Sequence, residues 1–148
     1  ADAPWPHIFD PFREAVAGKK VAVIGHFPFA PKALNQAADF YMLERSLNEG
    51  DYPDSAAEYI LPECDYVFIT GSAFVNKTAP RLLELSRESF NVVLGPSTPL
   101  APVLLEDYGV SQVTGMLPTS PLAMFEGLSG TDAGTTMFEW GHRVELSA

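Results

Sequence analysis

The chain has 148 residues, of which 47% are hydrophobic and 19% are charged, and its formal net charge is −10. This length and composition are typical of one soluble globular domain with an ordinary core. The acidic charge and the lack of a basic patch exclude nucleic acid and anionic membranes as expected partners. No apolar run approaches the roughly 18 residues that cross a bilayer.

We therefore predict a single domain over residues 1–148 and a cytoplasmic location. The first six residues, ADAPWP, have neither the basic nor the apolar region of a signal peptide. Cys64 is the only cysteine, which excludes an internal disulfide or a cysteine-based zinc site. Its place before an apolar run favours a buried structural thiol over a nucleophile.

Five short apolar runs predict buried strands, at residues 20–24, 40–43, 66–70, 91–94 and 112–116. They are apolar on both faces, as strands covered by helices on both sides must be. Helical patterns separate them, which is typical of βαβ units and a parallel sheet. The predicted fold is α/β: a three-layer Rossmann-like domain with a mainly parallel central sheet of about five strands flanked by helices.

Proline and capping residues set the expected helix ends. We expect Asp10 and Thr78 to cap two helices and Pro31 to open a third. Further helices are expected at 55–61, 103–108 and 121–126, and a loop at 130–136. The pattern over 137–146 fits either a helix or a strand.

The loops that follow the five strands are rich in Gly, Pro, Ser, Thr or charge. The carboxyl ends of parallel strands lie at one edge of a sheet, where ligands of open α/β folds bind. We therefore expect the five loops to converge on one binding site.

The loop GPSTPLAP, residues 95–102, carries three prolines, which restrict its backbone. One interpretation is a rigid pocket wall that holds Ser97 and Thr98 against a ligand. The alternative is that the prolines simply end a strand and begin the next helix.

His26 follows the first strand, in a loop with one glycine and a bulky Phe-Pro-Phe sequence. That loop disfavours close approach of a pyrophosphate and hence a standard NAD site. Imidazole and carboxylate are ligands for divalent metals, so His26 with Glu44 or Asp51 forms a candidate metal site. The alternatives are a structural histidine and solvated acids. Arg45, beside Glu44, adds a guanidinium to the same pocket.

The loop after the third strand, TGSAFVNKT, leads directly into a helix. Hydroxyls of Ser72 and Thr78, with the charge of Lys77, suit an anion such as phosphate or carboxylate. The alternative is that Thr78 only caps the helix and Asn76 only holds the turn. The spacing of a P-loop is absent.

No nucleophile–base–acid arrangement is recognisable, so catalysis is left open. One hypothesis is a module that binds a divalent transition metal or a small anionic ligand. A second is an enzyme, of transferase or lyase type, that acts on a small anionic or nucleotide-like substrate in the same cleft. A third is a scaffold whose loops only pack.

Several uncommon motifs occur in a specific order: VIGHFPF, then ER with EGDYPDSAAEYILPECD, then ITGSAFVNKT, then GPSTPLAP. In this order the sequence resembles the putative heavy-metal chelation domain family, whose function is unknown. The resemblance implies a Rossmann-like carboxyl-terminal domain, whose cleft with an enolase-like amino-terminal domain binds a metal or small ligand. The residues carried over by it are His26, Glu44, Asp51, Thr70, Asn76, Lys77, Thr78, Ser97 and Thr98. The chain shows no enolase-like segment, so we expect a partner domain or a homo-oligomer to complete it.

Overall fold

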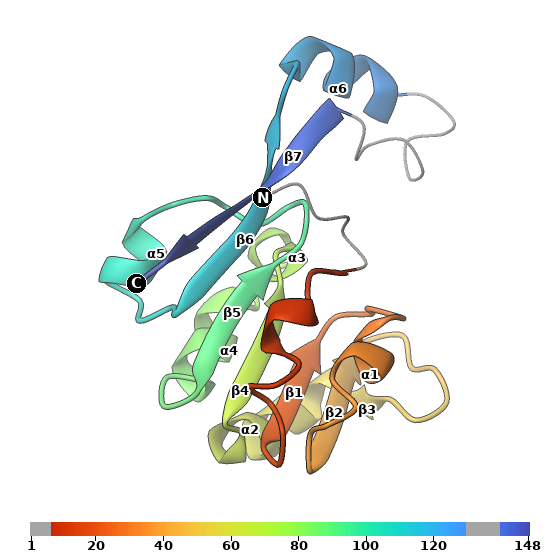
Figure 1. Ribbon diagram of the computed structural model, residues 1–148, viewed down its shortest axis with the longest axis vertical. Coiled ribbons are helices and arrows are strands. Elements are labelled where there is room, and N and C mark those ends of the chain that lie inside the picture. The colour runs from red at the N-terminus through yellow and green to blue at the C-terminus, as the bar shows by residue number, and fades with distance from the viewer. Residues whose placement is uncertain (1–6, 130–139) are drawn as a thin grey trace.

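The computed structural model describes residues 7–129 and 140–148 and contains one seven-stranded sheet (Figure 1). Its strands are β1 (Lys20–Ile24), β2 (Asp39–Glu44), β3 (Tyr52–Pro53), β4 (Tyr66–Thr70), β5 (Phe90–Leu94), β6 (Gln112–Pro118) and β7 (Gly141–Ser147). Their spatial order is β3-β2-β1-β4-β5-β6-β7, and only the pair of β6 and β7 is antiparallel. Among the helices of the described ranges, none combines the length and apolar character needed to span a membrane.

The predicted α/β class with a mainly parallel sheet is confirmed, and the five predicted strands are all present. The strand count differs. β3 has only two residues, one of them a proline, so no apolar run marks it. β7 lies in the segment whose pattern fitted helix or strand, and it pairs with β6 over seven residues. The expected loop at 130–136 lies outside the described residues.

The helices are short. They are α1 (Ala30–Ala33), α2 (Ala57–Ile60), α3 (Ser72–Val75), α4 (Ala79–Leu85), α5 (Val103–Glu106) and α6 (Pro121–Leu128), with 3-10 turns at Asp10–Phe12, Asp54–Ala56 and Leu61–Glu63. The expected caps are wrong in detail. Asp10 lies inside its turn, and the Thr78 side chain makes no capping hydrogen bond although Thr78 directly precedes α4.

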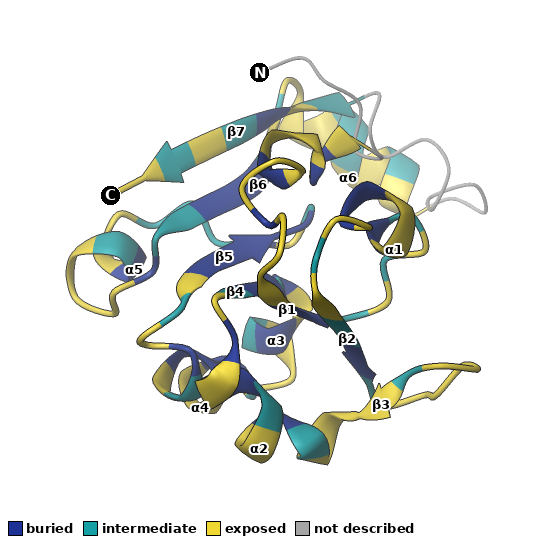
Figure 2. Cartoon of the chain, turned by 60° about the horizontal axis from the view of Figure 1, so that its bottom comes forward, coloured by how far each residue is buried: buried dark blue, intermediate teal, exposed yellow. Residues whose placement is uncertain are grey.

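Alternate residues of the central strands pack on opposite faces of the sheet, which makes the three layers (Figure 2). In β1, for example, Val21 and Val23 join one core cluster while Ala22 and Ile24 join the other. The first cluster contains α1 and the segment around Phe9, and the second lies beneath α2, α4 and α5. This alternation is what strands buried on both faces require.

The order of the sheet reverses between β1 and β4. From β1 the chain moves outward to β2 on one side, and it later continues through β4, β5 and β6 on the other. Open α/β sheets leave a crevice at the carboxyl ends of the strands at such a reversal. The fold therefore places this crevice beside the ends of β1 and β4.

Candidate functional site

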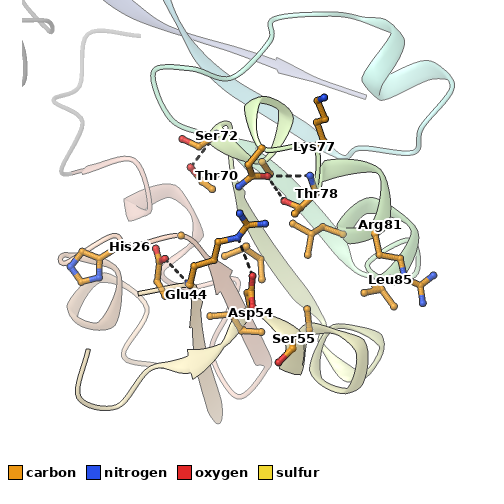
Figure 3. Close-up of a pocket in the computed structure, with 18 of the residues that line it drawn as sticks. His26, Glu44, Asp54, Ser55, Thr70, Ser72, Lys77, Thr78, Arg81 and Leu85 are labelled. Carbon is orange, nitrogen blue, oxygen red and sulfur yellow. Dashed lines mark hydrogen bonds and ion pairs between the residues drawn. The ribbon is translucent and has the colours of Figure 1, made fainter. Parts of the chain in front are cut away.

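A cavity of about 540 Å³ opens at this reversal point (Figure 3). It is lined by the ends of β1, β2 and β4, by the segment from Asp54 to Glu58, and by α3 and α4. Ile24, Leu43, Leu82 and Leu85 supply apolar walls. Its charged lining groups are three cations and three acids, namely Arg45, Lys77, Arg81, Glu44, Asp54 and Glu58.

Two glycines bring the loops at this edge into close contact. Gly25 has φ +110°, and a Cβ atom there would lie 2.8 Å from the Cβ of Thr70. At Gly71 a Cβ would lie 2.4 Å from the backbone nitrogen of Thr98. The loops after β1, β4 and β5 therefore meet at one edge of the sheet.

Glu44 and Arg45 follow one another where β2 ends, and both line the cavity. Arg45 Nε donates to Asp54 Oδ2 at 3.1 Å. Glu44 Oε2 accepts the backbone N–H of Arg45 at 3.0 Å. These contacts fix an arginine and two carboxylates on the wall formed by β2 and the turn after β3.

Arg81 of α4 ties the opposite wall to α2. Its Nε donates to Glu58 Oε1 at 2.9 Å, and its Nη1 donates to Glu84 Oε2 at 2.7 Å. The hydrogen bonds from Arg81 hold the pKa of the Glu58 carboxyl below its ordinary value, and the two carboxylates raise the pKa of Arg81. Glu58 and Arg81 therefore stay charged at neutral pH, and each nitrogen of Arg81 donates to a carboxylate.

The Asn76–Thr78 segment connects α3 to α4 and satisfies its own polar groups. Asn76 Oδ1 accepts the Thr78 backbone N–H at 3.1 Å and the Thr78 hydroxyl at 2.6 Å. Lys77 between them has φ +67°, the left-handed region that a non-glycine residue rarely adopts. The side chains of Asn76 and Thr78 therefore stabilise the turn between α3 and α4. These two helices are only four and seven residues long.

Glu44, Thr70, Asn76, Lys77, Thr78 and His26 all line the cavity, as the expected convergence requires. His26 lies at its edge, apart from the other labelled side chains (Figure 3). Its Nδ1 is 3.3 Å from Asn48 Nδ2, and the same amide nitrogen donates to Asp51 Oδ2 at 3.3 Å. One amide therefore separates the imidazole from the Asp51 carboxylate.

The three predicted metal ligands are not assembled into a metal-binding group. His26 and Asp51 contact Asn48, whereas Glu44 turns to the backbone of Arg45. Over residues 7–129 and 140–148, no group of three or more His, Cys, Asp or Glu side chains is placed to hold a metal ion. Metal binding by these residues remains a prediction.

The proline-rich loop of residues 95–102, which follows β5, is not a wall of this cavity, in contrast to its interpretation from the prolines. Neither Ser97 nor Thr98 lines it. Thr98 is buried, and its backbone lies directly against Gly71, while Ser97 is exposed. Among residues 7–129 and 140–148, the Thr98 hydroxyl has no hydrogen-bond partner. The 95–102 loop packs behind the loop that follows β4, so it supports the cavity wall without lining the cavity.

From the sequence, Arg45 was placed in this pocket, but three further charged residues of the lining were not singled out: Asp54, Glu58 and Arg81. These three come from the turn between β3 and α2, from α2 and from α4. Arg45 carried a signal, because it follows Glu44 at the end of a predicted strand. The other three appear in the sequence as ordinary charges on exposed helical turns.

Cys64 is buried and lies outside the cavity. Its Sγ is 3.3 Å from the backbone oxygen of Ile60, to which the thiol donates. Burial raises the pKa of the Cys64 thiol to about 11, so it stays protonated at neutral pH. This is the behaviour of a structural thiol.

Comparisons with known proteins agree with this architecture. The model of a family described as "Putative heavy-metal chelation" matches residues 7–144. The chain is similar to a solved protein of unknown function from the DUF364 family of Desulfitobacterium hafniense DCB-2, with 42% identity and a TM-score of 0.87 over 95% of this chain. A DUF364 protein of unknown function from Pyrococcus horikoshii shares the fold, with 22% identity and a TM-score of 0.81 over 92% of this chain.

A curated relative, an uncharacterized protein of Methanocaldococcus jannaschii, is 29% identical over 101 residues, which are 64% of this chain. The matches cover 39% of that relative and 57% and 58% of the two solved chains. The chain therefore spans less than two thirds of the length of these relatives.

Proposed function

Because the chain belongs to the DUF364 family, described as "Putative heavy-metal chelation", and carries a cavity where its sheet reverses, we propose that it is a small-ligand- or metal-binding domain. The cavity of about 540 Å³ at the ends of β1, β2 and β4 is the observation that carries the proposal. Its volume is in the range of pockets that bind small metabolites. Its position is where open α/β sheets bind their ligands.

The lining favours a ligand of mixed polarity. Three cations and three acids surround apolar walls, so the cavity has no excess of one charge. Several charges already pair with one another, as Arg45 does with Asp54 and Arg81 with Glu58. A ligand with both polar groups and an apolar part matches this surface better than a simple ion does.

A divalent transition metal is part of the proposal because of the family description and the position of His26. The imidazole and the Asp51 carboxylate flank the Asn48 amide, each at 3.3 Å. Displacement of that amide would free two ligands of types that borderline metals accept. Glu44, or atoms of a bound ligand, would supply further coordination.

A transferase or lyase that acts on a small anionic or nucleotide-like substrate in the same cavity is the second candidate. It is favoured by Glu44 and Arg45, consecutive residues at the end of β2 that both line the cavity and bring a carboxylate and a guanidinium to it. The partner domain of the longer relatives, or a second copy of the chain, would complete either site.

The test compares two tryptophan variants of the 148-residue chain in thermal shift and calorimetry. Ser55→Trp adds bulk at the exposed edge of the cavity, and Ser147→Trp adds the same bulk at the exposed end of β7. The screen contains nickel, zinc, cobalt and iron(II) salts, nucleotides, S-adenosylmethionine and phosphorylated metabolites. We expect a ligand that stabilises the wild type and Ser147→Trp and fails to stabilise Ser55→Trp.

Ligands that stabilise both tryptophan variants equally would place the site elsewhere and contradict the proposal. Metal binding is assigned by His26→Ala, which we expect to weaken any metal response about tenfold, roughly the effect of losing one ligand contact. An unchanged metal affinity in His26→Ala would remove His26 from the metal site.

A further inference from the structure

We infer that Arg45 is the oxyanion-binding residue of the cavity, that Asp54 positions it, and that the ligand therefore carries a carboxylate or phosphate group. The inference rests on the proposed function, because it assigns the chemistry of the same cavity. It goes further in naming the residue that recognises the ligand and the class of group recognised.

The Arg45 guanidinium is held at one nitrogen and free at the others. Its Nε donates to Asp54 Oδ2, nine residues later in the chain. Within the described residues, its two terminal nitrogens have no hydrogen-bond partner. A guanidinium held in this way presents two parallel N–H groups, which match the two oxygens of a carboxylate or phosphate.

The other two cations of the lining are poorer candidates. Arg81 uses Nε and both terminal nitrogens on Glu58 and Glu84, so each of its three nitrogens already donates to a carboxylate. Lys77 lines the cavity, but its side chain extends away from the other labelled groups (Figure 3). Arg45 is therefore the arginine of the lining whose two terminal nitrogens make no hydrogen bond within the described residues.

The groups next to Arg45 indicate what the rest of the ligand offers. Glu44 uses one carboxylate oxygen on the Arg45 backbone N–H, and its other oxygen has no partner in the described part of the chain. Thr70 Oγ1 already accepts the backbone N–H of Ser72 at 3.3 Å. Glu44 lines the same cavity, so its second carboxylate oxygen can accept a hydrogen bond from a hydroxyl or ammonium group of the ligand.

Two sources share this chemistry: hydroxy- or amino-carboxylates, and phosphorylated polyols such as nucleotides. Small hydroxy- and amino-carboxylates also chelate divalent metals through the same groups. A metal could then enter the cavity with its ligand, which fits a family described by metal chelation in a chain whose described residues form no three-ligand cluster.

The experiment measures binding of four probes to the 148-residue chain by calorimetry at constant ionic strength: citrate, L-histidine, AMP and ribose 5-phosphate. Arg45→Gln removes the charge, and Arg45→Lys keeps it but removes the paired N–H groups. We expect the probe that binds best to lose about tenfold or more in affinity in Arg45→Gln, and about severalfold in Arg45→Lys. Arg87→Gln, which removes an exposed arginine outside the cavity, is the matched control and leaves the affinity unchanged.

The positioning role of Asp54 has its own measurement. We expect Asp54→Asn to weaken the probe in the wild-type background and to add little in Arg45→Lys, because the paired donors that Asp54 orients are then absent. Asp54→Glu restores part of the affinity. A purely structural role would instead add the same loss in both backgrounds.

A probe that is excluded by Ser55→Trp but binds Arg45→Gln with wild-type affinity overturns the inference and leaves the proposed function intact. A wild type that binds none of the four probes at millimolar concentration also overturns it, while the wider screen still tests the cavity. If every bound compound is insensitive to both Ser55→Trp and Arg45→Gln, the inference and the proposed function fail together. Binding of only the carboxylates or only the phosphates that is weakened in Arg45→Gln supports the inference and selects the source.

Discussion

The two faces of the sheet are made by alternate residues of the same strands, yet they are filled in different ways. On the face that carries α1, aromatic rings close the space. Phe9 lies 5.2 to 5.8 Å, between ring centroids, from Phe27, Phe29 and Phe68. Phe9 and Phe68 are fully buried, and Phe27 and Phe29 are partly buried against this cluster.

The opposite face is built from smaller side chains and short helices. Ala57 and Ala73 are buried there, and both line the cavity. Where the helices end, charged residues take the place of apolar ones. The comparison shows that one face stabilises the domain by close packing, while the other leaves space and polar groups at its edge.

Truncation of a core side chain should give the largest difference in stability between the two faces. We expect Phe9→Ala to destabilise the fold by about 3–5 kcal/mol, because it removes a ring packed on three others. Leu82→Ala should cost about 2–3 kcal/mol, because Leu82 already borders an open cavity. Urea unfolding measures both. Equal losses would show that the cavity face is packed as tightly as the aromatic face.

The next largest effect on stability is expected at the contact between the loops that follow β4 and β5. Gly71→Ala places a Cβ atom 2.4 Å from the Thr98 backbone nitrogen, so the loops must move apart. We expect a loss of about 1–3 kcal/mol in the free energy of unfolding. The neighbouring exposed residue gives the control: Ser72→Ala should change stability by less than about 0.5 kcal/mol. If the two variants are equally stable, the close approach of the loops is not required.

The smallest effect is expected at the ion pairs that line the cavity. Glu58 and Arg81 are exposed, so their contribution to stability is small and screened by salt. The pKa of Glu58 is lowered in the folded state, so its contribution is present above the ordinary glutamate pKa and is lost as the pH falls through the folded value. Glu58→Gln should therefore have a slightly lower melting temperature at pH 7, with the difference vanishing as the pH falls below the folded-state pKa of Glu58.

Glu63→Gln, an exposed acid outside the cavity, is the control for this pH series. A difference between wild type and Glu58→Gln that persists or grows at low pH would contradict the role of the Arg81 pair in lowering the Glu58 pKa.

Much of the fold could be predicted from local patterns. A run such as residues 20–24 is apolar at every position after Lys20, and a strand buried on both faces is the structure that uses it. Because such strands alternate with helical segments, their carboxyl ends share one edge, which placed His26, Glu44 and Thr70 around one cavity. By contrast, β3 and β7 lack this signal: the first is two residues long, and the second is an edge strand of mixed burial.

The site was less accessible from the sequence, since side-chain direction and pairing depend on distant residues. Ser97 and Thr98 stand in the most distinctive loop of the sequence but do not line the cavity. Because Gly71 has no side chain, the backbone of their loop packs behind the loop that follows β4. The Asn76–Thr78 hydrogen bonds consume groups that appeared available for an anion. Asp54, in turn, gains its role only because it meets Arg45.

By itself, the sequence determined that this chain forms a parallel α/β sheet with polar loops along one edge, because residue periodicity and turn chemistry act over a few neighbouring positions. Only the tertiary structure decided which of those loops enclose the cavity, which charges are paired, and that the two terminal nitrogens of Arg45 have no partner among the described residues. These features depend on the order of the strands and on contacts between segments far apart in the chain.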